Sequence, residues 1–191
     1  HKLGITAAGA IFAYLVEDTH HALLQHITRI QVIPQDDYLM MDNFTLRNLE
    51  IVHSSSFQGK SLLEIIDKTS TAMGGRLLRR RLILPLKSVN EINRRLSLIE
   101  FFNKEESLKF EILDLLKGIS DLDRLVGKLA AEKISPKELG YLRQSLINIQ
   151  KIRELLSSHH DVLAWLEPLN NLEELISYLQ NHVNEELPVS L

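Results

Sequence analysis

Signals that start and stop helices recur at short intervals along the second half of this 191-residue chain. Ser88 and Ser135 each stand three residues before a glutamate, the pattern of a capping box at a helix N-terminus. Pro136 follows at the first helical position, where its missing N–H does no harm. Leucine and isoleucine recur at steps of three and four residues, which predicts amphipathic helices. The chain is therefore constrained to a series of helices packed side by side.

The first half of the chain contains one change of hydrophobic period. Helical spacing predicts a helix over residues 6–24 with Thr6 as its cap. Two short extended runs, 27–33 and 38–41, then flank a polar turn, which is typical of a β-hairpin. Further helices are predicted at 42–50, 69–84, 88–102, 105–117, 120–129, 136–157, 162–167 and 172–183, with Gly118 ending one of them as a C′ glycine.

The composition supports a helical fold. Hydrophobic residues make up 45% of the chain, enough for one substantial core or two small ones, and only 6% are aromatic, which favours helix packing over a β-sandwich. The chain has no cysteine, so neither a disulfide nor a thiolate metal site can form, and a cytosolic setting is expected. No apolar run reaches the ~20 residues that cross a bilayer, so no membrane partner is expected. The predicted fold is all-α, with one small β-hairpin near residues 27–41.

Residues 69–84 form the most distinctive predicted helix. A hydroxyl among residues 69–71 can cap its start, and Pro85 cannot continue it. Gly74 and Gly75 near its start cost about 1 kcal/mol each relative to alanine, so we expect a close approach by another backbone there. Tolerance of glycine in a first turn is the alternative explanation.

Basic residues are concentrated just after these glycines. Residues 76–95 contain seven basic residues and one acidic residue, a local charge of +6 in a chain of net charge −3. One interpretation is a patch that faces phosphate or an acidic partner. The other is a helix surface whose arginines pair with acids elsewhere in the fold.

No catalytic, cofactor-binding or metal-ligating residue is predicted. The sequence Gly59-Lys60-Ser61 matches the end of a phosphate-binding loop, but serine stands where the loop needs its first glycine, so the match is attributed to chance. His20, His21 and His26 have poor spacing for a metal and are interpreted as surface or interface residues. Asp121 and Asp123 are two residues apart in a predicted helix, so their side chains are expected to face apart.

Several blocks together resemble the MutS DNA mismatch repair family. They are Thr19 with LQHI at 24–27, MD at 41–42, TLRNLE at 45–50, LLEIIDKT at 62–69, TAMGGRLLR at 71–79, PL at 85–86, DLDRL at 121–125, KLA at 128–130 and PKEL at 136–139. The blocks span nearly the whole chain in the family's order and at similar spacing. The block around Gly74 and Gly75 is the most specific of them.

The resemblance implies one part of a larger machine, the N-terminal segment of the core and lever domain, domain III. Residues 1–86 would form a core subdomain that follows the connector, and residues 87–191 a helical lever arm that leads to the clamp. The implied function is structural coupling between the DNA-binding part and the ATPase, without chemistry in this segment. The residues expected to serve interdomain packing and coupling are Gly74, Gly75, Arg76, Arg47 and Asn48.

The full-length protein implied by the resemblance is a DNA-dependent ATPase that uses ATP and Mg²⁺. It would bind mismatched double-stranded DNA as a homodimer in the bacterial cytoplasm, associated with the nucleoid. This segment would contact its own clamp, connector and ATPase domains and would hold no cofactor itself.

Two alternatives and one corollary accompany this interpretation. A basic surface could contact DNA or a partner directly through Arg79, Arg80, Arg81, Arg94 and Arg95. The chain could instead be a stand-alone helical adaptor. If the returning half of the lever is absent, its apolar partner faces are uncovered, and the chain is expected to self-associate through them or to have mobile C-terminal helices.

Overall fold

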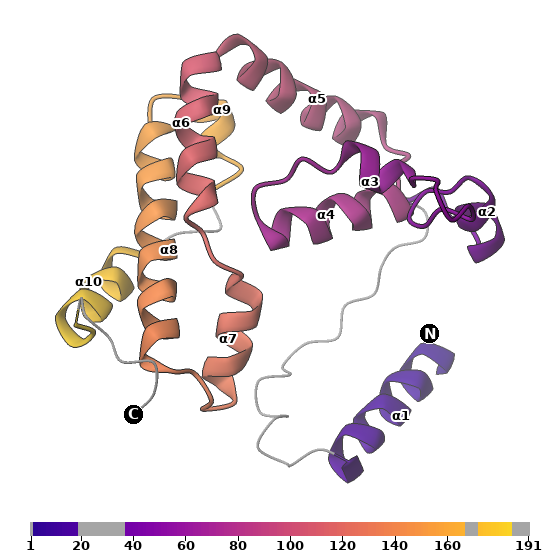
Figure 1. The fold of residues 1–191 in the computed structure, drawn as a ribbon, viewed down its shortest axis with the longest axis horizontal. Coiled ribbons are helices and arrows are strands. Elements are labelled where there is room, and N and C mark those ends of the chain that lie inside the picture. The colour runs from indigo at the N-terminus through magenta and orange to yellow at the C-terminus, as the bar shows by residue number, and fades with distance from the viewer. Residues whose placement is uncertain (1, 19–36, 167–171, 185–191) are drawn as a thin grey trace.

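The computed structural model describes residues 2–18, 37–166 and 172–184. Within these ranges the regular secondary structure is helical, and no strand is present. The helices are α1 (Lys2–Asp18), α2 (Asn43–Asn48), α3 (Leu62–Ile66), α4 (Ala72–Ile83), α5 (Val89–Lys104), α6 (Glu106–Lys117), α7 (Leu122–Ala130), α8 (Pro136–Leu155), α9 (His160–Leu163) and α10 (Leu172–His182) (Figure 1).

Helix α8 is the longest helix of the described chain, and its start agrees with the prediction. Ser135 accepts a hydrogen bond from the backbone N–H of Glu138, whose side chain accepts in turn from the backbone N–H of Ser135. With 20 residues it is a rod of about 30 Å. At α5 only half of the predicted box forms. Ser88 accepts from the N–H of Glu91, while the Glu91 carboxylate lies 3.7 Å from Arg94.

The predicted β-hairpin is not supported. Its first run and the first three residues of its turn lie outside the described residues. Its second run bonds to a segment distant in sequence. Tyr38 forms an isolated antiparallel bridge with Leu86, where the N–H of Leu39 donates to the Pro85 carbonyl and that of Lys87 to the Asp37 carbonyl. Proline ends α4 and leaves an extended connection to α5, so that connection supplies the backbone partners. Residue 38 thus pairs as an extended segment does, but with residue 86 and not with a neighbouring run.

Two further boundaries differ from the prediction. Helix α1 begins at Lys2, and Thr6 is not its cap, because the Thr6 hydroxyl donates to the Lys2 carbonyl inside the helix. The predicted continuation to residue 24 lies outside the described residues. Helix α9 covers only His160–Leu163, earlier and shorter than the predicted 162–167.

Helix α8 carries the core at two places along its length. One hydrophobic cluster joins α8 to α6 and α9, and a second joins α8 to α7 and α10; in Figure 1 α8 stands between α10 and the pair α6 and α7. Met73 at the start of α4 packs against the first cluster. The buried members are Ile112, Ile119, Ile152, Leu156 and Val162 in the first cluster and Leu125, Leu142, Leu146, Ile176 and Leu179 in the second.

No helix in the described ranges is both long enough and apolar enough to cross a lipid bilayer.

Candidate functional site

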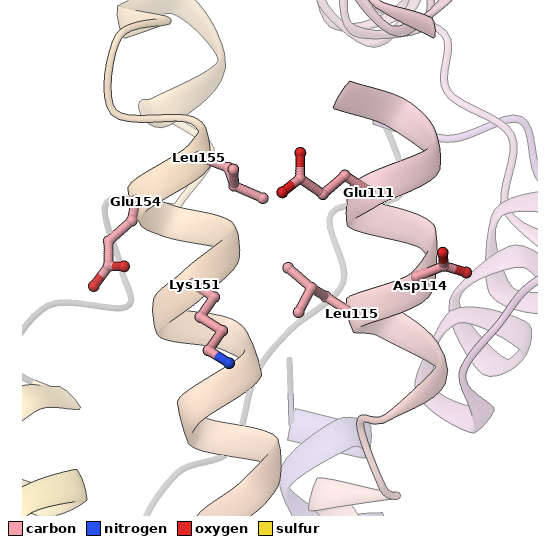
Figure 2. A pocket seen from close by; sticks show the side chains of 6 residues that line it. All are labelled: Glu111, Asp114, Leu115, Lys151, Glu154 and Leu155. Carbon is pink, nitrogen blue, oxygen red and sulfur yellow. The ribbon is translucent and has the colours of Figure 1, made fainter. Parts of the chain in front are cut away.

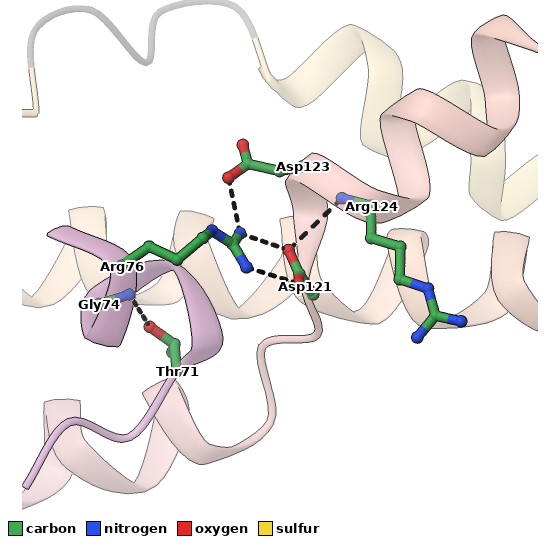
Figure 3. A network of polar contacts seen from close by, with 6 residues as sticks. All are labelled: Thr71, Gly74, Arg76, Asp121, Asp123 and Arg124. Carbon is green, nitrogen blue, oxygen red and sulfur yellow. Dashed lines mark hydrogen bonds and ion pairs between the residues drawn. The ribbon is translucent and has the colours of Figure 1, made fainter. Parts of the chain in front are cut away.

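The candidate site lies where the start of α4 meets the start of α7. Thr71 caps α4, because its hydroxyl accepts a hydrogen bond from the backbone N–H of Gly74 at 3.0 Å. This cap fixes the direction in which the helix leaves its loop, and Arg76, one half-turn further on, extends from α4 toward α7 (Figure 3). The predicted hydroxyl cap is thereby confirmed and assigned to Thr71.

Arg76 holds two carboxylates at once. Its Nη1 lies 2.8 Å from Oδ2 of Asp121 and its Nη2 lies 2.7 Å from Oδ1, so the pair is bidentate. The same Nη2 lies 2.7 Å from Oδ2 of Asp123 (Figure 3). Planar guanidinium groups match carboxylates in this two-point geometry, which fixes orientation as well as distance. The contact joins residues 45 and 47 positions apart in the sequence.

The electrostatics of the site follow from this contact. Hydrogen bonds from Arg76 lower the pKa of the Asp121 carboxyl to about 2, because they stabilise its charged form. The two carboxylates raise the pKa of Arg76 in return. The Asp121 side chain is 27% exposed and that of Arg76 50% exposed, so water screens the pair in part.

The expectation that Asp121 and Asp123 face apart was wrong. Asp121 is the N-cap of α7, with an extended backbone (φ −68°, ψ 91°), and its side chain accepts from the N–H of Arg124. The helical rotation per residue does not apply to a cap, so both carboxylates can turn toward α4. The side chain of Arg124 extends away from them (Figure 3). A charge pattern in the sequence could have indicated the site. Two acidic residues, Asp121 and Asp123, stand at the start of one predicted helix, and Arg76 stands in another without an acidic neighbour.

Polar side chains of α8 hold the turn that presents Asp121. Ser145 is fully buried, accepts a hydrogen bond from the backbone N–H of Ser120 at 3.0 Å, and donates to a carbonyl of its own helix. Asn148, 7% exposed, donates to the Leu115 carbonyl near the end of α6. The turn between α6 and α7 is therefore tied to α8 at two points, which fixes the position of Asp121.

Gly118 ends α6 as predicted, but it is the C-cap residue and not a C′ glycine. Its φ is −85° and its ψ is 0°, a backbone that other residues can adopt. A Cβ placed there would lie 2.5 Å from Nδ2 of Asn148. Glycine is needed at this position because the Asn148 side chain occupies the space.

The paired glycines of α4 are close to their own loop. A Cβ at Gly74 would lie 3.0 Å from the Thr71 hydroxyl, and one at Gly75 would lie 3.3 Å from both Asp67 Oδ2 and Thr69 Oγ1. These neighbours are side chains of the preceding loop and not another backbone. The expected close approach by another backbone is therefore not found among the described residues, and the glycines make room for side chains at the start of α4.

The other predicted arginines lie in different surroundings. Arg94 sits over the Trp165 ring, 4.1 Å from its centroid. Burial and the neighbouring charge of Arg95 lower the pKa of Arg81, and Arg80 is exposed. Thus Arg76 and Arg94 of the basic run have partners within the described chain, and Arg80 and Arg81 form no salt bridge there.

Arg47 and Arg79 line one surface hollow, formed between α2, the loop after it and α4. Asn48 ends α2 and is exposed. The structure therefore brings Arg47 near Arg79 but brings neither into the Arg76 contact.

A larger hollow of about 650 Å³ lies between α6 and α8 (Figure 2). It is lined by Glu111, Asp114, Leu115, Lys151, Glu154 and Leu155. Its charged side chains do not converge, because Asp114 extends away from α8 (Figure 2). Asp114 pairs with Lys117 on its own helix. Among the described residues no group of three or more histidine and acidic side chains could hold a metal ion.

Sequence reasoning missed one helix start. Ser61, taken as part of a chance phosphate-loop match, is buried and caps α3 in a complete capping box with Glu64. The signal was Ser61 followed three residues later by Glu64, the same pattern that was recognised elsewhere in the chain.

Comparison with known proteins agrees with the sequence resemblance. A family model described as MutS domain III matches residues 44–191. A DNA mismatch repair protein MutS of Cytophaga hutchinsonii is 42% identical over 188 residues, 97% of this chain and 22% of that protein. The MutS proteins of Christiangramia forsetii and Flavobacterium johnsoniae are also 42% identical, over 97% and 100% of this chain, and again 22% of their own length is covered. The chain thus spans about a fifth of the curated relatives it matches, and it belongs to the MutS family, in the region of domain III.

Proposed function

We propose that this chain is the coupling domain of a MutS-type DNA mismatch repair protein. It carries conformational change between the part that holds DNA and the ATPase, and it performs no chemistry of its own. Residues 1–86 act as the core subdomain and residues 87–191 as the lever arm. In the complete protein its neighbours are the connector, the clamp and the ATPase, which binds ATP and Mg²⁺. That protein acts on mismatched DNA as a homodimer in the bacterial cytoplasm, at the nucleoid.

The observation that carries this proposal is the contact of Arg76 with Asp121 and Asp123. It joins α4, in the first proposed subdomain, to α7, in the second. Met73, one turn earlier on α4, packs into the core of the second subdomain, so a polar and an apolar contact lie side by side. A junction with discrete, directional contacts has few alternative arrangements, and such elements transmit rigid-body movement.

The lever itself is built to move as a unit. Helix α8 shares one hydrophobic cluster with α6 and a second with α7 and α10, so a rotation of α8 carries its neighbours with it. The buried Ser145 and Asn148 tie the α6–α7 turn to the same rod. A displacement at the start of α4 therefore reaches α8 through Asp121 and this turn.

The test is a substitution of Arg76 by glutamine in the complete mismatch repair protein. Arg124→Gln is the matched control, because it removes the same charge from a side chain that extends away from the contact. We expect Arg76→Gln to slow ATP-driven release from mismatched DNA by about two- to thirtyfold, the range for mutations that alter coupling between distant sites. DNA binding without nucleotide should be unchanged. Normal release by Arg76→Gln, or equal slowing by Arg124→Gln, would contradict the proposal.

A second candidate function is direct contact with DNA. The observation in its favour is that the charge of Arg95 contributes, after burial, to lowering the pKa of Arg81, so the two cations lie near each other. Neither forms a salt bridge with a carboxylate in the described chain. Two adjacent cations of this kind attract phosphate. This function requires the chain to bind duplex DNA with a steep salt dependence that weakens in Arg81→Gln and Arg95→Gln. Absence of binding at low salt would exclude it.

A further inference from the structure

The second hollow of the molecule, of about 620 Å³, has an unusual combination of linings. Arg47 from α2, Arg79 from α4 and His53 from the intervening loop border it. Volumes of this size are typical of sites that bind a small molecule or a few residues of a peptide. The remaining lining residues are polar or aliphatic: Asn43, Leu46, Val52, Ser54, Ser55 and Ile83.

The two guanidinium groups have no carboxylate partner in the described parts of the chain. The salt bridges found there involve other cations, and neither Arg47 nor Arg79 takes part in a side-chain hydrogen bond among those residues. Two unpaired cations around one concave surface repel each other unless an anion lies between them. The hollow therefore has a net positive charge and unused donors.

The carboxylates nearest in sequence are already engaged. Glu50 accepts hydrogen bonds from Ser54 and Ser55, and these bonds lower the pKa of its carboxyl. Glu64 accepts from Ser61 in the capping box of α3, and His53 adds a weaker favourable charge there. Neither carboxylate lines the hollow, so an anion would have to come from elsewhere.

The loop that borders the hollow has a defined shape. Glu50 has a left-handed backbone (φ 49°), and its carbonyl accepts from the N–H of Leu62, which closes the loop on itself. A Cβ at Gly59 would lie 2.3 Å from the Ser54 hydroxyl, so glycine is required for the loop to fold against this side chain. Ser54 and Ser55 are thereby held beside the arginines before any partner binds, which reduces the entropic cost of binding.

The apolar part of the lining distinguishes between possible anions. Leu46, Val52 and Ile83 contribute aliphatic surface from three separate elements. A free phosphate or a DNA backbone gains nothing from such surface. An acidic side chain with an aliphatic neighbour gains both the charge-assisted hydrogen bonds and the burial of apolar area.

From this combination we propose that the hollow bordered by Arg47 and Arg79 binds an acidic peptide segment, in which a carboxylate meets the two guanidinium groups and a neighbouring aliphatic side chain lies against Leu46, Val52 and Ile83. The proposal goes beyond the coupling function and does not depend on it, because the hollow does not include Arg76 or α7.

The experiment is an NMR titration of the isotope-labelled chain with an acetylated and amidated peptide of sequence Leu-Glu-Asp-Leu. We expect saturable shifts at the backbone amides of Arg47, Ser54 and Ser55. The isosteric peptide Leu-Gln-Asn-Leu should bind at least about tenfold more weakly, because it lacks the charge-assisted hydrogen bonds. Inorganic phosphate and a short DNA duplex are titrated in parallel.

Variants separate the hollow from general charge. Arg47→Gln and Arg79→Gln should each weaken peptide binding by about tenfold. Arg80→Gln is the matched control, since it removes one charge from the next residue of the same helix without bordering the hollow. Arg79→Lys keeps the charge and should recover part of the affinity.

Several outcomes would overturn the proposal. The first is the absence of saturable shifts, and the second is equal affinity for the two peptides. The third is a loss of peptide affinity in Arg80→Gln as large as that in Arg47→Gln or Arg79→Gln. If phosphate or duplex DNA shifted the same amides with an affinity equal to or higher than that of the acidic peptide, the hollow would be a phosphate site and not a peptide site. None of these results bears on ATP-driven release, so the two proposals can fail separately.

Discussion

Arg76 and Asp121 form a bidentate ion pair, with Nη1 2.8 Å from Oδ2 and Nη2 2.7 Å from Oδ1. Asp121 has two roles at once, since it also caps α7 through the N–H of Arg124. Asp121 thus begins α7 and also binds α4 through Arg76. Any movement of α4 relative to α7 has to break this pair or to rotate the start of α7.

The pair should make stability depend on pH in an acidic window. The pKa of Asp121 is about 2 in the folded chain and has an ordinary value of about 3.9 in an unfolded one. Because the folded pKa is lowered, its stabilising contribution is complete above pH ~4 and is lost as the pH falls toward ~2. Asp121→Asn keeps a capping side chain but removes the charge, so its deficit in the free energy of unfolding should shrink over this window.

Urea unfolding of the chain and of Asp121→Asn at a series of pH values measures this deficit. The pKa of Glu138 is also lowered to about 2, by Lys128 first, but this titration is common to both proteins and cancels in the difference. A deficit that stays constant with pH would mean that the ion pair contributes nothing.

The buried hydroxyl of Ser145 should be important for stability. Ser145→Ala leaves the backbone N–H of Ser120 without its partner in a buried turn, which costs about 1–3 kcal/mol. Ser157→Ala, at an exposed position just past the same helix, should change the free energy of unfolding by less than about 0.5 kcal/mol. Equilibrium denaturation compares the two, and equal effects would show that the turn is not held by this bond.

Gly118 and Asn148 should be energetically coupled. Gly118→Ala places a methyl group against Nδ2 of Asn148 and displaces it from the Leu115 carbonyl. In the background of Asn148→Ala that space is vacant, so the same change should cost much less. A double-mutant cycle in the free energy of unfolding should give a coupling of about 0.5–3 kcal/mol. Strict additivity would mean that a methyl group at position 118 does not contact Asn148.

The glycines of α4 should respond differently from a glycine in open space. Gly127 of α7 has nothing near its missing Cβ, so Gly127→Ala should stabilise the chain by about 1 kcal/mol through helix propensity. In Gly74→Ala the new Cβ would lie 3.0 Å from the capping hydroxyl of Thr71. This variant should therefore be stabilised less than Gly127→Ala, or be destabilised. Thermal unfolding of both variants measures the two changes in stability. Equal stabilisation would mean that Gly74 is only tolerated in the first turn of the helix and is not required there.

The exposed apolar stripe of α5 should promote self-association. Val89, Ile92, Leu96 and Ile99 follow steps of three, four and three residues and are 37–66% exposed. We expect the sedimentation coefficient of the chain to rise with concentration, and Leu96→Lys to suppress this rise. A Leu175→Lys control changes an exposed leucine of α10, which lies apart from α5 (Figure 1), and should leave association intact. A chain that stays monomeric would contradict this prediction.

The helices could be predicted from sequence because their signals are local. Ser135 and Glu138 form the whole capping box within one turn, and Thr71 caps α4 within three residues. The pairing of the segment around residue 38 could not be predicted in this way, because hydrogen bonds between extended segments depend on which backbone is nearby in space. Residue 38 is close to residue 86 only after α4 has folded and reversed the chain.

The candidate site was predictable only in part. The sequence indicates that Arg76 and the glycines are special, and the bidentate partner 45 residues away follows from tertiary packing alone. The prediction that Asp121 and Asp123 face apart assumed that both residues are helical. Asp121 is an N-cap, so the helical rotation per residue does not apply to it. The hollow bordered by Arg47 and Arg79 had no local pattern, since its lining comes from two helices and a loop.

The most direct test of the coupling account measures the distance between α4 and α7. The chain has no cysteine, so spin labels can be placed at Arg80→Cys and Gly127→Cys without removing native thiols. In the otherwise unchanged chain, and in Arg124→Gln, pulsed electron paramagnetic resonance should give one narrow distance distribution. Arg76→Gln should broaden it or add a second distance. The same narrow distribution in Arg76→Gln would contradict the claim that this arginine holds the two helices together.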